Sequence, residues 1–448
     1  MSATNVTCRA FSVWTLCVAL AFTGTHGQAQ ISNTTCSLAS CEYTYQLSNS
    51  TFSCPKSGCT EIPADMPLDV VVVNLRENNI KSVEVALHDC SELETLDLSH
   101  NAISSIAEKA LPVSLVSLDL SNNLITMEVL SGRAFDDVDL LEDLNLANNR
   151  IDNLTIPNIF WSKMPDLRRL DMSGNQISAI GHNALTDLRM LESIDLSGNL
   201  IKFLEAEDFM GLYHLLNLNL SGNQVEVIPD RFFHGLDSIK TLDLSDNLIR
   251  ELSNLSLAQG EALETLHLER NKLSKIPSAM SSSLSNLQFL YLDGNLLETI
   301  ETKAFPPSLK GISIQKCDAL TEIGDVFGTE AAIQLKMVTI RENPKLNAIR
   351  DSAFGGPDSP VTDLDLSYNA LTTLPNFLVN WNNLVSADLT GNFWDCDCNM
   401  AWVKNISGSS PVLQSLVLVL YCILYCIYPF LYRFSQHEPF GSAPDHSN

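Results

Sequence analysis

A row of acidic and amide side chains is the part of this sequence best suited to chemistry. Each member is the fifth residue of a short repeated motif and stands four residues before the ninth. The row consists of Asp97, Asp119, Asn145, Asp171, Asp195, Asn219 and Asp243. Carboxylates on adjacent parallel strands would lie about 5 Å apart, a spacing that suits a metal site or an acid–base pair.

No other catalytic group accompanies this row. The sequence lacks a paired base, a nucleophile or a histidine constellation, and it has no GxxxxGKS/T phosphate loop, HExxH, GxSxG or kinase signature set. We therefore interpret the row as a structural feature of the repeat. The sequence predicts no enzyme activity, no cofactor and no metal.

An internal repeat predicts the strands that carry the row. The segments "LETLDLSHNAI" from Leu93 and "LESIDLSGNLI" from Leu191 share the pattern LxxLxLxxNxL, which occurs in fourteen copies, numbered 1 to 14 below. Their ninth positions are Asn78, Asn101, Asn123, Asn149, Asn175, Asn199, Asn223, Asn247, Asn271, Asn295, Cys317, Asn343, Asn369 and Asn392. The spacing is 24 residues from Asn175 to Asn295 and 22 to 26 elsewhere.

Both halves of this pattern have a physical reason. The alternation in LxL predicts a short strand with one buried face, and each repeat must pack its leucines on those of the next. The asparagine offers two donor hydrogens and an acceptor oxygen to the buried polar groups of the turn after the strand. We expect Cys317 to act as a small substitute in this ladder.

These residues closely resemble the leucine-rich repeat family over about residues 68–395. The resemblance implies an α/β fold: a right-handed horseshoe solenoid of about 14 repeats with a parallel β-sheet on its concave side. Short helices, turns or extended segments would form the convex side. The 24-residue period is similar to that of extracellular members of the receptor or adhesion type.

The amino terminus indicates export. Residues 1–29 are predicted to be a signal peptide, because the apolar stretch Ala10–Phe22 is followed by small residues that suit cleavage. Residues 30–67 are similar to the cysteine-rich N-terminal cap of secreted leucine-rich repeat proteins. Cys36, Cys41, Cys54 and Cys59 are expected to form disulfides in this cap, with the pairing left open.

The carboxyl terminus combines part of a cap with an apolar run. Cys396 and Cys398, with Trp402, match the opening of the family's C-terminal cap, here residues 396–411. Residues 412–432 carry no charge and would form a helix of about 31 Å, which is long enough to cross a membrane. A short cytoplasmic tail, 433–448, would follow. A distorted cap and a truncated or alternatively spliced C-terminus are the alternatives.

The outward strand positions of repeats 9 to 12 differ from those of earlier repeats. Repeats 2 to 8 carry small or acidic residues there, whereas the later ones carry aromatic, basic and sulfur-containing side chains of the kinds found in protein interfaces. The predicted ligand-binding residues are His267, Glu269, Arg270, Phe289, Tyr291, Gln315, Lys316, Met337 and Arg341. Drift in irregular repeats is the alternative explanation.

The positions of the glycosylation sequons also favour repeats 9 to 12 as the ligand-binding region. NxS/T triplets outside the signal begin at Asn33, Asn49, Asn153, Asn219, Asn254 and Asn405. A glycan on Asn219, in repeat 7, would obstruct the middle of the concave face and leave repeats 9 to 12 for a ligand. Cys90 and Cys317 are predicted to be buried, unpaired thiols.

The sequence therefore predicts a non-catalytic recognition protein at the cell surface. Its formal net charge of −26 disfavours nucleic acid as a partner. We expect one C-terminal membrane span, an external amino terminus, and a protein or other macromolecular ligand on the concave face. The alternatives are a secreted, soluble matrix or inhibitor protein and the truncated ectodomain of a leucine-rich repeat receptor kinase.

Overall fold

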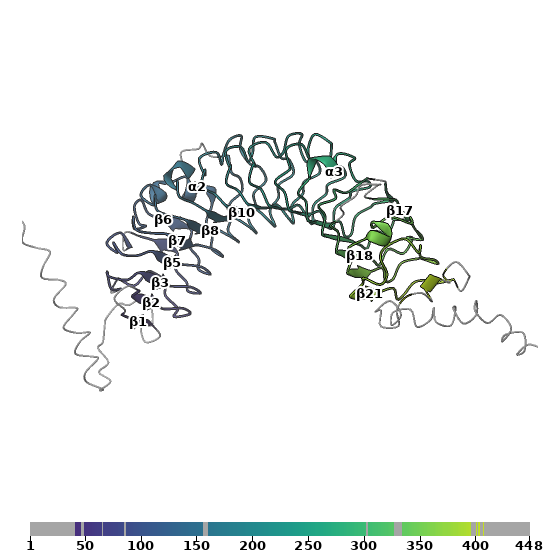
Figure 1. Cartoon of the computed structure of the whole chain (residues 1–448). Coiled ribbons are helices and arrows are strands. Elements are labelled where there is room, and N and C mark those ends of the chain that lie inside the picture. The colour runs from purple at the N-terminus through teal and green to yellow at the C-terminus, as the bar shows by residue number, and fades with distance from the viewer. Residues whose placement is uncertain are drawn as a thin grey trace, which may run out of the picture.

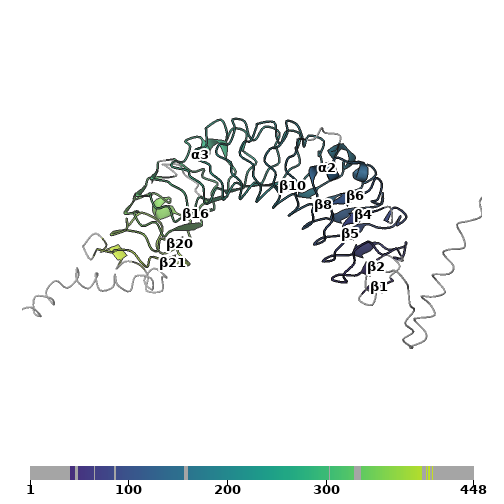
Figure 2. The same cartoon turned by 180° about the vertical axis from the view of Figure 1, so that it is seen from behind.

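The computed structural model shows a single arch built from stacked coils (Figure 1). It describes residues 41–45, 49–64, 66–84, 87–155, 160–301, 303–326, 334–395, 400, 402–403 and 406. Strands line the inner edge of the arch along its whole length, and the strands β1 and β21 stand at its two opposite feet (Figures 1 and 2). The inner, concave face is therefore one continuous sheet.

This sheet has 16 strands. Fourteen of them come from the 14 sequence repeats, one from each, and begin at the third position of the motif. β1 pairs with β2 antiparallel, and every later pair is parallel. In spatial order the strands are β1 (Glu42–Thr44), β2 (Thr51–Ser53), β3 (Val72–Asn74), β5 (Thr95–Asp97), β7 (Ser117–Asp119), β8 (Asp143–Asn145), β9 (Arg169–Asp171), β10 (Ser193–Asp195), β11 (Asn217–Asn219), β12 (Thr241–Asp243), β13 (Thr265–His267), β14 (Phe289–Tyr291), β16 (Gly311–Gln315), β18 (Met337–Arg341), β20 (Asp363–Asp365) and β21 (Ser386–Asp388).

The register stacks identical repeat positions on one another. Leu218 of β11 pairs with Leu242 of β12, and Leu242 pairs with Leu266 of β13. All three leucines are buried, whereas the residues on either side of each are partly or fully exposed. The period-two alternation of LxL therefore sends one leucine per repeat into the core and the flanking side chains to the concave surface. The predicted solenoid with a parallel concave sheet is confirmed.

The asparagine ladder is also confirmed. The Asn199 Nδ2 donates to the carbonyl oxygens of Met172 and Leu196, each at 3.0 Å, and its Oδ1 accepts from the Ile177 N–H at 3.0 Å. In repeat 11 the buried Cys317 takes this place, with its Sγ 3.6 Å from the Leu292 oxygen. Burial raises the pKa of this thiol to about 11, so it stays protonated and can only act as a weak donor.

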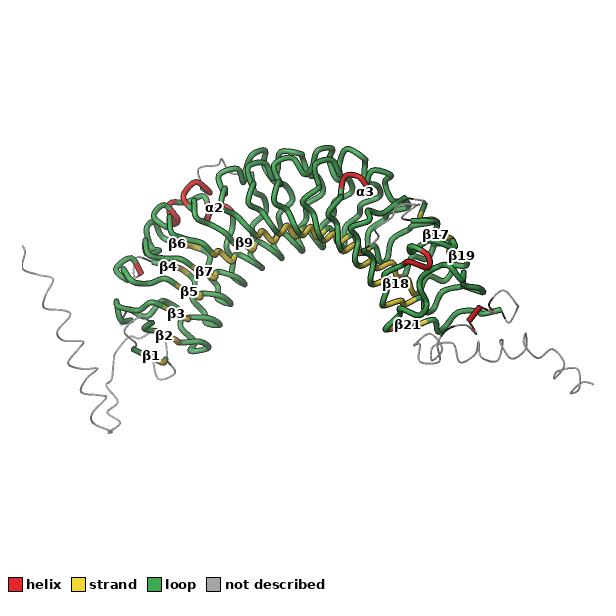
Figure 3. Tube along the Cα trace, in the orientation of Figure 1, coloured by secondary structure: helices red, strands yellow, loops and turns green. Residues whose placement is uncertain are grey.

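The convex side consists mainly of turns, with few helices among the described residues (Figure 3). Two small parallel sheets, one of two strands and one of three, are separate from the main sheet. The helices are α2 (Met127–Leu130) and α3 (Met280–Ser283), the 3-10 turns are η3 (Arg133–Phe135), η4 (Trp161–Lys163) and η5 (Gly356–Asp358), and the small sheets are β4 (Ser82–Val83) with β6 (Ser105–Ile106), and β15 (Thr299–Ile300), β17 (Glu322–Ile323) and β19 (Ala348–Ile349). Large apolar side chains fill the space between these turns and the sheet, among them Phe135, Trp161, Phe209 and Phe232.

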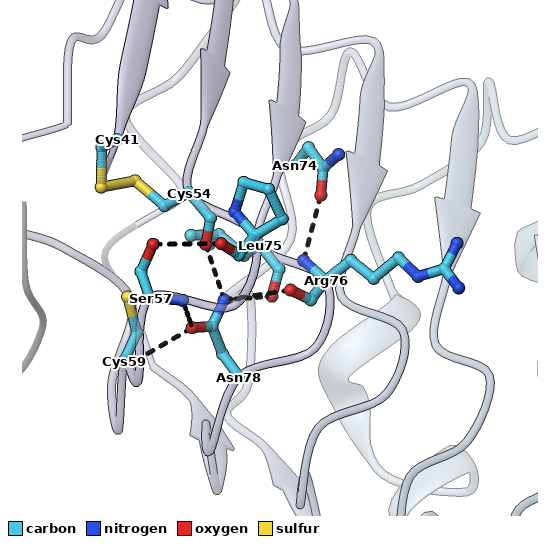
Figure 4. The surroundings of a disulfide bond; sticks show 9 residues. Cys41, Cys54, Ser57, Cys59, Asn74, Leu75, Arg76 and Asn78 are labelled. Atoms are coloured by element: carbon cyan, nitrogen blue, oxygen red, sulfur yellow. Dashed lines mark hydrogen bonds between the residues drawn. A yellow bond between two sulfur atoms is a disulfide. The ribbon is translucent and has the colours of Figure 1, made fainter.

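A disulfide-bonded hairpin covers the first repeat. Cys41 and Cys54 flank the β1–β2 hairpin and are bonded to each other, and Cys59 is also disulfide-bonded. The Nδ2 of Asn78, the first ladder residue, donates to the Cys54 oxygen at 2.8 Å, and its Oδ1 accepts from the Cys59 N–H at 3.0 Å (Figure 4). The hairpin is thus joined to the solenoid through the same contacts that join one repeat to the next.

Several predicted features lie outside the described residues. They are the signal peptide, the Cys36 cap residue, the Cys396 and Cys398 pair, and residues 407–448 with their apolar run. Within the part of the chain that the structure describes, no helix has both the length and the apolar character needed to span a membrane.

Candidate binding face

The row of position-5 carboxylates closes the turn after each strand. The Asp195 Oδ1 accepts from the Ser197 N–H at 2.8 Å, and the Asp243 Oδ1 accepts from the Ser245 N–H at 2.9 Å. The same bond, from position 7 to position 5, recurs at Asp97, Asp119, Asn145, Asp171, Asn219, Asp365 and Asp388. An oxygen acceptor at position 5 satisfies a backbone donor in every such repeat, which accounts for the row without catalysis.

The row changes character at repeat 9, where aromatic rings replace the carboxylates. His267 of β13 and Tyr291 of β14 are register partners, and their rings stack with centroids 4.5 Å apart and planes 4° from parallel. The His267 Nδ1 lies 3.0 Å from the Glu269 Oε1. This hydrogen bond raises the pKa of His267, although partial burial opposes the shift. Three predicted residues therefore form one contact group.

A polar network continues across the next two strands. The Ser313 Oγ donates to the Asp293 Oδ1 at 2.7 Å, and the Gln315 N–H donates to the same oxygen at 2.8 Å. Gln315 also accepts from the Arg341 Nε at 2.8 Å through its Oε1. Arg341 in turn lies 3.7 Å from the Asp365 carboxylate. Burial raises the pKa of Asp293, while the hydrogen bonds from Ser313 and Gln315 oppose that shift.

An apolar cluster lies beside the stacked rings, two residues earlier on β14. A Cβ added to Gly311 of β16 would meet the Phe289 Cδ1 at 2.9 Å and the Met337 Cε at 3.2 Å. The missing side chain therefore lets Phe289 and Met337 close over the backbone of β16. Met337 is still 44% exposed, so the cluster presents apolar surface on the concave side.

Arg270 and Lys316 lie apart from the other predicted ligand-binding residues. Strand alternation had predicted that they share the concave face with them. Both occupy position 8, where the chain has left the strand and has a positive φ, 52° at Arg270 and 54° at Lys316. Arg270 pairs with Asp246 of the preceding repeat, and Lys316 lies 3.7 Å from Glu342 of the following one. The remaining seven predicted residues come together on β13, β14, β16 and β18 and the residues that follow them.

Gly311 is the contributor that sequence reasoning missed. A glycine carries no functional group and therefore escapes a search for interface residue types. The available signal was its place at position 3 of a strand, where the register partners are Phe289 and Met337.

Comparison with known protein families identifies these coils. The profile described as "Leucine rich repeat" matches residues 165–225, 217–273 and 261–307, and related repeat profiles match residues 139–189 and 89–106. The coils at residues 89–106 and 139–307 thus match leucine-rich repeat profiles, and the remaining coils share their fold.

Similar leucine-rich repeat proteins match only part of this chain. Podocan-like protein 1 of Homo sapiens is 28% identical over 159 residues, which is 30% of this chain and 31% of that protein. Tsukushi of Gallus gallus is 30% identical over 136 residues (29% and 36%), and leucine-rich repeat-containing protein 3 of Danio rerio is 34% identical over 114 residues (25% and 41%). The matched segments thus span roughly a third of the length of these relatives.

Solved structures show the same fold. The leucine-rich repeat domain of APL1 has a TM-score of 0.59 and 21% identity, covering 76% of this chain and 85% of that one. The Leptospira interrogans leucine-rich repeat protein LIC12759 has a TM-score of 0.52 and 23% identity, covering 69% and 72%.

The sequons that the structure describes lie in different settings on the leucine-rich repeats. Asn49 and Asn254 are exposed, and Asn153 and Asn219 are partly exposed. On the concave face, the Asn219 Nδ2 donates to the Asp195 Oδ2 at 2.9 Å. A glycan on this nitrogen would still leave one hydrogen for that bond. Asn33 and Asn405 lie outside the described residues, and glycosylation at all six sequons remains a prediction.

Residues of the predicted C-terminal cap pack on repeat 13. Met400, Val403 and Ile406 are buried, and the Trp402 Nε1 donates to the Leu374 oxygen at 3.2 Å. Trp402 also packs on Trp381 with ring centroids 4.8 Å apart. The C-terminal cap over residues 396–411 remains a prediction.

Within the described part of the chain, one group has donor atoms close enough together for a metal ion. The ligand atoms of His182, Glu205 and Glu207 lie within 4.8 Å of one another, and all three residues are exposed. Exposed acidic groups of this kind are common on protein surfaces, and the group lies away from the concave network.

Proposed function

We propose that this leucine-rich repeat protein is a non-catalytic recognition protein that binds a protein ligand on the concave face of repeats 9 to 12. The observation that supports the proposal is that seven predicted residues lie on the adjacent strands β13, β14, β16 and β18 or directly after them, where stacked rings, an apolar cluster and a hydrogen-bonded Arg341 occur. Aromatic and arginine side chains in such groups contribute much of the binding free energy at protein interfaces.

Replacing Tyr291 and Arg341 together with alanine is expected to weaken ligand capture at least about 10-fold, because such side chains often contribute 2 kcal/mol or more each. Full-length chain in fluorescent nanodiscs would be titrated onto a panel of cell lines, and the apparent Kd read by flow cytometry. The control is Ser193→Ala with Thr241→Ala, which alters outward strand positions in repeats 6 and 8. Unchanged binding by a double variant with a native circular dichroism spectrum would refute this site.

The proposal extends to attachment at the cell surface. Residues 1–29 would be removed as a signal peptide, the capped repeats would lie outside, and residues 412–432 would span the membrane once, leaving 433–448 in the cytoplasm. The uncharged length of this run supports an anchor, and the disulfide between Cys41 and Cys54 supports an oxidising compartment.

Alkaline carbonate extraction tests the anchor. Tagged full-length protein is expected to stay in the membrane pellet, whereas a chain stopped after Ser410 is expected in the medium, because 21 uncharged and mostly apolar residues resist extraction. Glycosidase treatment of both proteins would check that each has been exported. Release of well-folded full-length chain would favour the secreted matrix or inhibitor protein instead.

A further inference from the structure

An aromatic groove lies at the C-terminal foot of the arch, beside the last residue that the structure describes. Its volume is about 180 Å³, and the residues that line it include Phe377, Trp381, Trp402 and Ile406. Phe377 is 54% exposed, and Trp402 is partly exposed. The indole N–H groups of the two tryptophans donate to backbone oxygens of the fold, at 2.9 and 3.2 Å. The groove therefore presents mainly apolar ring surface to an occupant.

The composition of this foot suits the headgroup layer of a neutral lipid. The described residues that line the groove include three asparagines and no charged side chain. Tryptophan is enriched at membrane–water interfaces, where its apolar ring and polar edge are both accommodated. Residues 351–403 carry seven aspartates and no Lys, Arg or His. An anionic lipid surface, which attracts basic segments, would repel this foot.

The proposed anchor brings the groove to the bilayer. Ile406 lines the groove and is buried in the fold, and only the five residues 407–411 separate it from the proposed span 412–432. Five residues reach at most about 18 Å when fully extended, and the headgroup layer occupies about 5–8 Å of that distance. So short a tether gives a high effective concentration, so that even a weak affinity for lipid keeps the groove in contact with it.

We propose that the C-terminal foot of the arch rests on the bilayer, with Phe377 and the ring of Trp402 in the headgroup layer of neutral lipid. This inference rests on the anchor in the proposed function and adds a second contact between the protein and the membrane. A span alone would let the arch swing about residues 407–411. Two contacts restrict its tilt and hold the concave face in a fixed orientation above the membrane.

Intrinsic fluorescence reports this contact without a label. Of the five tryptophans, Trp14 lies in the predicted signal peptide, Trp161 is buried in repeat 4, and Trp381, Trp394 and Trp402 all belong to the C-terminal foot. Full-length chain would be placed in phosphatidylcholine nanodiscs with and without a nitroxide on the lipid headgroup. We expect the nitroxide to quench the emission, and Trp402→Phe to lose a large part of this quenching. Emission that the nitroxide leaves unchanged would contradict a position in the headgroup layer.

Hydrogen–deuterium exchange tests the contact at Phe377. Amides of residues 376–382 are expected to exchange more slowly in full-length chain in phosphatidylcholine nanodiscs than in a lipid-free chain stopped after Ser410. Both chains keep the sequon at Asn405, so a glycan there would affect them equally. Phe377→Ser is expected to reduce this protection by up to about 10-fold, because it removes a large apolar side chain from the contact. The control is Phe203→Ser, which alters an 80% exposed phenylalanine in repeat 6 and should leave the protection unchanged.

The outcomes separate this inference from the anchor on which it rests. Equally fast exchange in the two chains, with the full-length chain retained in the nanodisc, would leave the anchor standing and refute the contact. Equally slow exchange in the stopped chain would show that the protein itself covers the groove, which also overturns the proposal. Full-length chain that does not enter nanodiscs would show that the anchor is wrong. Stronger protection on phosphatidylserine than on phosphatidylcholine would refute the proposed lipid class.

Discussion

Replacing Asn199 with alanine is expected to lower the free energy of unfolding by roughly 3–5 kcal/mol. Asn199 is 3% exposed and binds the carbonyl oxygens of Met172 and Leu196 and the N–H of Ile177. Alanine would leave these buried groups without their partner, and each such group costs about 1–3 kcal/mol. Guanidinium unfolding of the purified chain, followed by far-ultraviolet circular dichroism, measures the change.

The matched control is Asn217→Ala, the same substitution at an exposed outward position of β11. We expect it to change the free energy of unfolding by less than about 0.5 kcal/mol. Because leucine-rich repeats contact only their sequence neighbours, the Asn199 variant should also broaden the unfolding transition at repeat 6. Equal stability of the two variants would contradict the structural role given to the ladder.

The solenoid could be predicted from the sequence because its determinants are local and recur. The pattern around Leu242 specifies a strand with one buried face, and Asn247, five residues later, specifies the turn that follows it. Each repeat contributes only one strand to the sheet, so the order of the strands follows the order of the repeats. The 14 repeat strands begin at position 3 of their motif in every case.

The candidate site could be predicted only in part because alternation ends with the strand. β13 ends at His267, and Arg270 three residues later has a left-handed backbone that turns its side chain toward Asp246. The same geometry applies to Lys316. A rule based on outward strand positions therefore holds at positions 3 and 5 and fails at position 8, where the chain changes direction.

The closure of Phe289 and Met337 over Gly311 depends on three repeats at once. The spacing of repeats predicts that these residues are register partners, but side-chain directions across a missing Cβ follow only from the packed structure. Burial of a charged residue on the convex side is equally hard to predict from one repeat, since its neighbours come from the repeats before and after it.

Asp208 is such a residue, and removing its charge is expected to stabilise the protein. It is 1% exposed, and the 24-residue spacing places it between the buried Ala184 and Phe232 of adjacent repeats. Its Oδ2 accepts from the Glu205 N–H at 2.8 Å, whereas its Oδ1 has no hydrogen-bond partner. Burial, reinforced by repulsion from Glu205 and Glu207, raises the pKa of Asp208 from 3.8 to about 6.

The direction of the pH dependence follows from this shift. Between pH 3.8 and about 6 the folded chain holds a proton that the unfolded chain has released, so stability falls as pH rises through this range. Above pH 6 the full cost of the buried charge is present, and it amounts to roughly 2–3 kcal/mol. Asp208→Ala, which restores the residue type of the preceding repeat, is expected to recover much of that free energy at pH 7.4.

Unfolding free energies from pH 4 to pH 8 would measure the effect. The difference between Asp208→Ala and the native chain should grow as pH rises toward 6 and stay constant above it. Asp208→Asn retains an acceptor for the Glu205 N–H and tests whether the gain comes from the lost charge. Glu207→Gln removes one of the repelling charges, so it should lower the pKa of Asp208 and shift the pH profile to lower pH without abolishing it, because burial is the larger cause. A native chain whose stability relative to Asp208→Ala does not vary with pH would show that this carboxyl titrates normally.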